Sequence, residues 1–301
     1  MTKNRYTIID LGSNSFHMLT VEKCNNGFSV YAKSKQKVRL AAGLDEQHIL
    51  NQETIQKGLD CLAKFKNKLS LLQPVKTLIT ATAALRLAEN KQVFISQAEE
   101  ILQLPINLIS GLEEAKIIYK GVAFTEKINI PLLVIDIGGA STELIIGQEN
   151  EIKIAQSLHM GCVTWLKRYF PDKKLNEQNF TTAIKAAKSV IEPYAAEYRD
   201  QGWSVAMGAS GTIQAIQEIN QKQKLSPEIN LQLLYQIKSL CIDCETIENL
   251  HIDGLIPSRK PVFASGLAIL IALFETLGMA SMQRSKGALR EGLISILFAE
   301  K

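Results

Sequence analysis

Two segments of this sequence, 126 residues apart, carry the same short pattern of residue types. The first reads YTIIDLGSNSFHMLTV and the second reads LLVIDIGGASTELIIG. At this offset the identical pairs include Asp10 with Asp136, Gly12 with Gly138 and Ser15 with Ser141. The offset is much longer than the roughly 20–50 residues of solenoid repeats. The repeat therefore predicts two related domains, each opening with a strand, a turn and a second strand.

The rest of the chain alternates between strand-like and helix-like patterns. A third strand is expected over 28–40, an amphipathic helix over 51–72, and a strand running into a long helix over 76–102. Such alternation is typical of α/β proteins, and 301 residues suit two domains of roughly 150 residues each. We expect an α/β fold with a first domain over 1–126, a second domain beginning at 127, and a ligand cleft between them.

Composition excludes several classes of partner. The net charge of +4 is too weak to predict a nucleic-acid-binding protein, although it does not oppose an anionic ligand. The five cysteines show no disulfide-scaffold spacing, which favours a reducing compartment. The most apolar stretch, PVFASGLAILIALF, is shorter than the roughly 20 residues of a membrane helix and predicts a core helix. We expect a cytoplasmic protein that binds neither nucleic acid nor membrane.

The two repeated turns consist almost entirely of small residues. Backbone N–H groups in such turns can approach a ligand closely, and successive N–H groups form an anion site suited to phosphate. The candidate phosphate-binding residues are Gly12, Ser13, Asn14, Ser15, Gly138, Gly139 and Ser141. The alternative is that both are ordinary hairpins with glycine-rich turns.

Each turn follows an aspartate, and a carboxylate would repel a bound phosphate unless a cation lay between them. Mg²⁺ fits this requirement, because it takes one or two carboxylates together with phosphate oxygens and water. Asp10 and Asp136 are therefore candidate metal ligands. Glu143, seven residues after Asp136, is a further candidate, either directly or through water.

A third small-residue turn lies in WSVAMGASGTIQAI, where an apolar strand leads into a helix. Free N–H groups at a helix N-terminus are a second kind of phosphate site. Its candidate residues are Gly208, Ser210, Gly211 and Thr212. The alternative is a tight connection in which Thr212 caps the helix.

The segment SGLEEAKIIYKGV has two adjacent glutamates at the start of a helix. Ser110 and Glu113 have the spacing of a capping box, which gives Glu113 a structural role. Glu114 has no basic residue three or four positions further on, and a carboxylate facing a cleft can act as a general base on water. The alternative is that Glu114 only interacts favourably with the helix dipole.

Several basic residues are candidates for contacts with an anion. Arg86 lies one turn into a helix that Thr82 could cap, and a guanidinium there could hold a phosphate by two hydrogen bonds. Alternate positions on one strand face carry Lys33, Lys35, Lys37 and Arg39. They guide a polyanion if that face borders the cleft; otherwise they protect a sheet edge. Further candidates are Arg259, Lys260, Arg284, Lys286 and Arg290.

As a set, these motifs resemble the exopolyphosphatase and guanosine pentaphosphate phosphohydrolase (Ppx/GppA) family. The resemblance runs nearly end to end, through segments such as TATAALRLAEN, ISGLEEAKIIYKGV, VIDIGGASTELIIG, AMGASGTIQAI and GALREGLI. It implies two ribonuclease-H-like domains of the actin, sugar-kinase and heat-shock ATPase superfamily, with the active site between them. It also implies a second domain over 127–284, a last helix over 285–301 that packs back on the first domain, and a homodimer.

The resemblance also implies roles for individual residues. Glu114 matches the family's catalytic base, Arg86 the phosphate-facing arginine, and Asp136 and Glu143 the metal-binding acids. The phosphate turn runs over 138–142, which adds Ala140 and Thr142. Ala140 replaces the usual third glycine, and its methyl group is expected to narrow the approach of phosphate. Longer members continue into a helical region linked to binding long polyphosphate, so the substrate length stays open.

These expectations lead to Mg²⁺-dependent hydrolysis of the terminal phosphoanhydride of inorganic polyphosphate, with release of orthophosphate. The 5′ end of guanosine pentaphosphate (pppGpp) is the alternative substrate. A second class of function is a sensor that binds an alarmone or polyphosphate without hydrolysis, although binding alone needs no general base. A third is a kinase or ATPase of the same superfamily, which acceptor-dependent ATP turnover would reveal.

Overall fold

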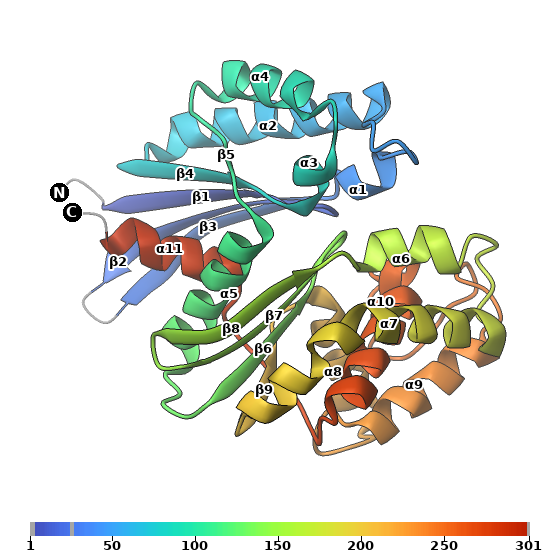
Figure 1. Cartoon of the computed structure of the whole chain (residues 1–301). Coiled ribbons are helices and arrows are strands. Elements are labelled where there is room, and N and C mark those ends of the chain that lie inside the picture. Colours follow the sequence, from blue (N-terminus) through green and yellow to red (C-terminus); the bar gives the residue numbers. More distant parts are fainter. Residues whose placement is uncertain (1–3, 25–26, 300–301) are drawn as a thin grey trace.

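The computed structural model describes residues 4–24 and 27–299, and it contains two five-stranded mixed sheets (Figure 1). The first sheet has the order β3-β2-β1-β4-β5, with strands β1 (Arg5–Leu11), β2 (Phe16–Cys24), β3 (Gly27–Gln36), β4 (Lys76–Ala81) and β5 (Asn107–Leu108). The second has the order β10-β9-β6-β7-β8, with strands β6 (Leu132–Ile137), β7 (Thr142–Gln148), β8 (Glu151–Leu158), β9 (Val205–Gly208) and β10 (Gln283–Arg284).

The two sheets share one topology. In each, the first three strands along the chain pair antiparallel, and the fourth pairs parallel to the first. The first turn joins β1 to β2 and the second joins β6 to β7, so the sequence repeat corresponds to the opening hairpin of each sheet. The predicted α/β class with two related halves is confirmed.

Helices cover the outer side of each sheet, and further helices lie between the two sheets (Figure 1). With the first sheet lie α1 (Leu40–Gly43), α2 (Gln52–Leu72), α3 (Ala83–Leu87) and α4 (Lys91–Leu102). With the second lie α6 (Cys162–Tyr169), α7 (Glu177–Gln201), α8 (Gly211–Gln223), α9 (Leu231–Asp243) and α10 (Lys260–Leu277). The apolar helix α10 has the length and composition of a membrane span, but 83% of that stretch is buried, as the predicted core helix requires.

Two helices, α5 (Gly111–Glu126) and α11 (Leu289–Ala299), lie between the sheets (Figure 1). Helix α11 contacts β1 and β4, helix α5 contacts β7 and β8, and the two helices pack on each other. Their backbones touch at glycines: a Cβ on Gly121 would lie 2.0 Å from the Ala288 carbonyl oxygen, and one on Gly292 would lie 1.9 Å from that of Ile117. These two helices therefore couple the two halves of the molecule.

The contacts of α5 and α11 bear on the predicted domains. Helix α5 belongs to the predicted first domain by sequence, yet it packs on the second sheet. The division at residue 126 stays a prediction. The expected final helix, 285–301, begins at Leu289. Its last two residues lie outside the described part of the chain, as do residues 1–3 and 25–26 of the predicted first domain.

Several element boundaries differ from the prediction. The expected strand over 28–40 ends at Gln36, because Arg39 has a left-handed backbone (φ 61°) and starts α1. The long helix after β4 is two helices, α3 and α4, separated by residues 88–90. Thr82 makes no capping hydrogen bond; the amide of Ala84 donates instead to Ser13 Oγ at 3.1 Å. The cap of α8 is Ser210 rather than Thr212.

Candidate active site

A cavity of about 580 Å³, here called the central cavity, lies where the opening hairpins of the two sheets meet. It is lined by most of the predicted site residues: Asp10, Gly12, Ser13, Asn14, Ser15, Glu114, Asp136, Gly138, Gly139, Ser141, Glu143, Ser210, Gly211 and Thr212. The turns approach each other closely, since a Cβ on Gly139 would lie 2.8 Å from Ser13 Cβ. The sequence repeat therefore places two small-residue turns face to face around one cavity.

Three predicted phosphate-binding residues do not line this cavity. Ala140 is buried, with 2% of its surface exposed. Thr142 is fully buried, and its hydroxyl donates to the Met160 carbonyl at 2.7 Å. Gly208 lies in β9, where a side chain would collide with Ile213. These three residues are therefore not part of the cavity lining, and the expected narrowing of the phosphate approach by the Ala140 methyl group stays a prediction.

Glu114 lies in the first turn of α5 and faces the central cavity with only 7% of its surface exposed. The predicted capping box of Ser110 and Glu113 is present and begins this helix. Burial raises the pKa of Glu114 to about 7, although the Arg86 guanidinium opposes the shift. Glu114 is thus placed to exchange a proton near neutral pH.

Arg86 contacts the candidate base directly. Its Nη1 donates to Glu114 Oε2 at 3.1 Å and to the Ile109 carbonyl at 3.0 Å, and the residue is not among those lining the central cavity. Arg86 therefore orients the candidate base through Nη1, and its predicted contact with phosphate stays a prediction. The sequence analysis missed this ion pair because it considered only basic residues on the same helix as Glu114.

Of the other three acids in the cavity wall, Glu143 is buried, whereas Asp10 and Asp136 are half-buried. Burial raises the pKa of Asp10 to about 7 and that of Asp136 to about 6. Burial, with Glu114 and Asp136 close by, raises the pKa of Glu143 well above its usual value, although Glu143 Oε1 accepts a hydrogen bond from Ser157 Oγ at 2.8 Å. Four carboxyl groups in one cavity favour the binding of a cation.

The side chains around the central cavity suit a divalent metal only if water and substrate supply further ligands. Within residues 4–24 and 27–299, no three His, Cys, Asp or Glu side chains lie close enough together to hold a metal ion by themselves. A closed site made only of protein ligands is therefore not formed. One or two carboxylates from Asp136, Glu143 and Asp10, completed by water and phosphate oxygens, fit the way Mg²⁺ is usually bound.

These acids predict how stability depends on pH. Their pKa values are higher in the folded protein than in the unfolded chain, so between about pH 4 and pH 7 these acids bind more protons in the folded state. The pKa of His17, which burial lowers to about 3, has the opposite effect, but it is one group against several acids. Stability is then expected to fall as the pH rises through this window. In EDTA, urea unfolding should give a free energy at least about 1.4 kcal/mol lower at pH 7.5 than at pH 5, the equivalent of one pKa unit. The Asp136→Asn variant should show a smaller difference, and a flat wild-type profile would contradict the expectation.

The central cavity is also lined by the basic side chains of Lys33, Lys35, Arg259 and Arg290, and by His17. Arg259 and Arg290 were predicted only as candidates for contacts with an anion, and His17 was not predicted as a site residue. Burial and the guanidiniums of Arg259 and Arg290 lower the pKa of Lys35 to about 8. Cations that disfavour one another's charge in this way favour an anionic ligand between them.

Arg259 also lies against the third small-residue turn, at Gly211. A Cβ on Gly211 would lie 1.9 Å from Arg259 Nη2, so the guanidinium occupies the space that any side chain at position 211 would need. The glycine at this helix N-terminus therefore admits an arginine. Phosphate binding at Ser210, Gly211 and Thr212 stays a prediction, now with Arg259 beside it.

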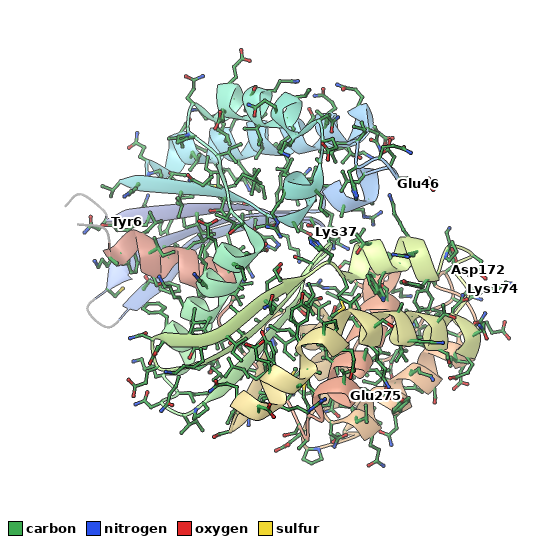
Figure 2. All side chains as sticks on the ribbon, in the orientation of Figure 1. Tyr6, Lys37, Glu46, Asp172, Lys174 and Glu275 are labelled. Carbon is green, nitrogen blue, oxygen red and sulfur yellow. The ribbon has the colours of Figure 1, made fainter. Side chains whose placement is uncertain are left out.

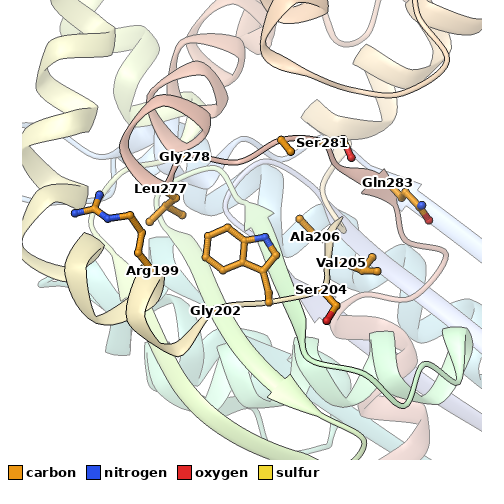
Figure 3. Close-up of a pocket in the computed structure, with 11 residues that line it drawn as sticks. Arg199, Gly202, Ser204, Val205, Ala206, Leu277, Gly278, Ser281 and Gln283 are labelled. Atoms are coloured by element: carbon orange, nitrogen blue, oxygen red, sulfur yellow. The ribbon is translucent and has the colours of Figure 1, made fainter.

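A second cavity, of about 550 Å³, lies near Arg199, Trp203 and Gly278, beyond the ends of α7 and α10 (Figure 3). None of the predicted site residues lines it. The central cavity, which collects the acids, the turns and the cations, is therefore the candidate active site.

Comparisons with known proteins identify the family of this chain. The sequence matches the Ppx/GppA phosphatase family over residues 19–299. A guanosine-5′-triphosphate,3′-diphosphate pyrophosphatase of Pseudoalteromonas translucida is 51% identical over 298 residues, covering 99% of this chain and 60% of the relative. One of the same name from Aeromonas hydrophila is 50% identical, covering 96% of this chain and 58% of the relative. The chain thus spans about 60% of the length of these curated relatives.

Solved structures show the same fold over the whole chain. An exopolyphosphatase from Cytophaga hutchinsonii superimposes with a TM-score of 0.88 at 25% identity, covering 99% of both chains. The Ppx/GppA family member of Aquifex aeolicus gives 0.80 at 19% identity, covering 99% of this chain and 98% of the other. The paired turns, the buried Glu114 and the family match over residues 19–299 lead to one conclusion: this chain belongs to the Ppx/GppA phosphatase family.

Proposed function

We propose that the central cavity hydrolyses a terminal phosphoanhydride bond and releases orthophosphate. The observation that carries the proposal is Glu114: a buried carboxyl group with a pKa near 7, held by Arg86 in a cavity that also contains two small-residue turns. Binding alone would require no such base. The names of the curated relatives, which are pyrophosphatases, support the same class of reaction.

The proposed reaction assigns a step to each group. The backbone N–H groups of the two turns hold the terminal phosphate, and Glu114 accepts a proton from a water molecule in line with the bond to be broken. The water oxygen bonds to the terminal phosphorus while the bond from that phosphorus to the bridging oxygen breaks. Orthophosphate leaves, and the shortened chain retains the bridging oxygen.

A divalent cation, which we propose to be Mg²⁺, would be held by Asp136 and Glu143, with Asp10 as a further contact. When bound, it supplies positive charge to the oxygens of the transferred group. The protein's own contribution is the positions of the three carboxylates, fixed at the ends of β1 and β6 and the start of β7.

Two substrates have specific support. The curated relatives are named for guanosine-5′-triphosphate,3′-diphosphate, which favours the 5′ end of guanosine pentaphosphate. Inorganic polyphosphate is favoured by Lys33 and Lys35, which lead from the cavity along β3 toward solvent. Lys37 lies between the two halves of the molecule (Figure 2), where its ammonium group donates to the Ser258 carbonyl. We therefore propose that both are hydrolysed, and the test below ranks them.

The lysines of β3 yield a prediction about chain length. Replacing both Lys33 and Lys35 with alanine should raise KM for long polyphosphate by roughly 10-fold, because the chain beyond the cavity loses its nearest positive charges. The effect on inorganic triphosphate should be smaller, since fewer of its phosphates extend past the cavity. Phosphate release at several chain lengths and salt concentrations measures this. Lys185→Ala, an exposed lysine of α7, is the control, and an equal effect at every length would contradict the prediction.

The proposed function itself is tested by phosphate release from polyphosphate of several lengths, guanosine pentaphosphate and ATP, each with Mg²⁺ or EDTA. We expect release from the first two with Mg²⁺ and none with EDTA. Tight binding without release would favour the sensor, and ATP turnover that requires an acceptor would favour a kinase. The expected homodimer and the cytoplasmic location stay predictions, for which sedimentation and cell fractionation are the measurements.

A further inference from the structure

The two halves of the repeat differ at one position that carries an ionisable side chain in the central cavity. The partner of Asp136 across the β6–β7 hairpin is Glu143, and the partner of Asp10 across the β1–β2 hairpin is His17. The spacing is the same in both hairpins, so His17 is the equivalent of Glu143. One half therefore presents two carboxyl groups, whereas the other presents a carboxyl group and an imidazole.

The imidazole of His17 contacts Arg290, which is the second residue of α11. Arg290 Nη1 lies 3.3 Å from His17 Nδ1. A guanidinium has only donors, so His17 Nδ1 must be the acceptor, and the ring is neutral with its proton on Nε2. Burial and the charge of Arg290, which lower the pKa of His17 to about 3, agree with this assignment.

The guanidinium of Arg290 forms no ion pair with a carboxylate of residues 4–24 or 27–299. The residue is half-buried and lines the cavity beside Asp10. A partly buried guanidinium whose remaining donors face a cavity is suited to bidentate contact with phosphate.

The position of Arg290 relative to the candidate base is fixed by the backbone. Glu114 is in the first turn of α5 and Arg290 is in the first turn of α11, the two helices whose backbones touch at Gly292 and Ile117. Before α11, the Glu126 carboxylate at the end of α5 accepts from the Lys286 amide at 2.6 Å. Glu114 and Arg290 therefore belong to two helices that pack tightly on each other.

We propose that Arg290, oriented by the neutral imidazole of His17, is a catalytic residue that contacts the transferred phosphoryl group in the central cavity. The proposal rests on the proposed hydrolysis and adds a residue to it. In the second half of the repeat, Glu143 and Asp136 attract a cation. In the first half, His17 instead contacts the positively charged guanidinium of Arg290, which is part of the protein.

The test uses four single variants and one double variant. Arg290→Gln should lower kcat by about 10²–10³-fold, the usual loss for one donor to developing charge, and Arg290→Lys should recover only part of it. His17→Leu removes the acceptor and should lower kcat by about 10-fold, whereas His17→Asn, which keeps an acceptor near the place of Nδ1, should stay within about threefold of wild type. The double variant Arg290→Gln with His17→Leu should be no slower than Arg290→Gln alone, because both act through one contact.

Two further measurements separate this role from a structural one. Thermal unfolding should show all variants folded, and calorimetric titration with orthophosphate should show weaker binding in Arg290→Gln than in wild type. A kcat for Arg290→Gln within threefold of wild type would overturn the proposal, as would losses that multiply in the double variant. If wild type releases no phosphate from any substrate, the proposed hydrolysis fails. The calorimetric titration then decides alone whether Arg290 contacts phosphate. Equal affinities of wild type and Arg290→Gln for orthophosphate would reject that contact.

Discussion

Replacing Glu114 with glutamine is expected to lower kcat for phosphate release by at least about 10²–10⁴-fold, the contribution typical of a general base. The amide has nearly the same shape, and its oxygen can still accept the hydrogen bond that Arg86 Nη1 donates at 3.1 Å in wild type. What it loses is the ability to take a proton from water. Because substrate contacts the turns and not this carboxylate, KM should change much less than kcat.

The neighbouring residue provides a matched control. Glu113 is exposed and belongs to the capping box, in which its carboxylate accepts from the Ser110 amide at 2.7 Å. Glutamine is also accepted at this capping position, so Glu113→Gln should leave both kcat and the melting temperature close to wild type. The pair separates the chemistry of position 114 from any general effect on the start of α5.

The pH profile adds a second, independent readout. The pKa of Glu114, raised by burial to about 7, should make kcat/KM rise with pH through this region in wild type, because only the ionised carboxylate accepts a proton. Glu114→Gln should lose that rise. An unchanged kcat, or a rise that persists in the variant, would remove Glu114 from the mechanism.

The fold could be predicted largely because its strongest signal is local. Each opening hairpin has its apolar runs, aspartate and small residues within about 16 consecutive positions, so one alignment of two short segments revealed the duplication. Boundaries that depend on single backbone conformations could not be found this way. The left-handed backbone of Arg39 ends the alternating pattern of β3, and an arginine gives no warning of that conformation.

The site could be predicted only in part, and the missing contacts share one property. Arg86 reaches Glu114 from 28 residues away, and Arg290 reaches His17 from 273 residues away. Such contacts depend on how α3, α5 and α11 are packed, which no local pattern specifies. One of them did leave a trace: position 17 is the equivalent of position 143, and it carries histidine where the other half carries glutamate.

The second large effect concerns the packing of these helices. Gly292→Ala should lower the free energy of unfolding by at least about 2 kcal/mol, as overpacking of a tight contact usually does. In an exposed helix the same change would stabilise by roughly 0.5–1 kcal/mol. Here the new Cβ would lie 1.9 Å from the Ile117 carbonyl oxygen, and this neighbour is backbone, which cannot rotate away as a side chain could. Differential scanning calorimetry should show a melting temperature at least about 4 °C lower.

The same substitution should also lower kcat in the molecules that remain folded. To admit a methyl group, α11 must move away from α5, and this displaces Arg290 relative to Glu114, since each lies in the first turn of its helix. Ser295→Ala, one turn further along α11, is the control: it removes the hydrogen bond from Ser295 Oγ to the Gly292 carbonyl at 2.7 Å but adds no atom at the contact. A destabilised Gly292→Ala protein with wild-type kcat would mean that α11 contributes stability alone. Loss of both would show that the close approach of two glycine-containing helices sets the geometry of the active site.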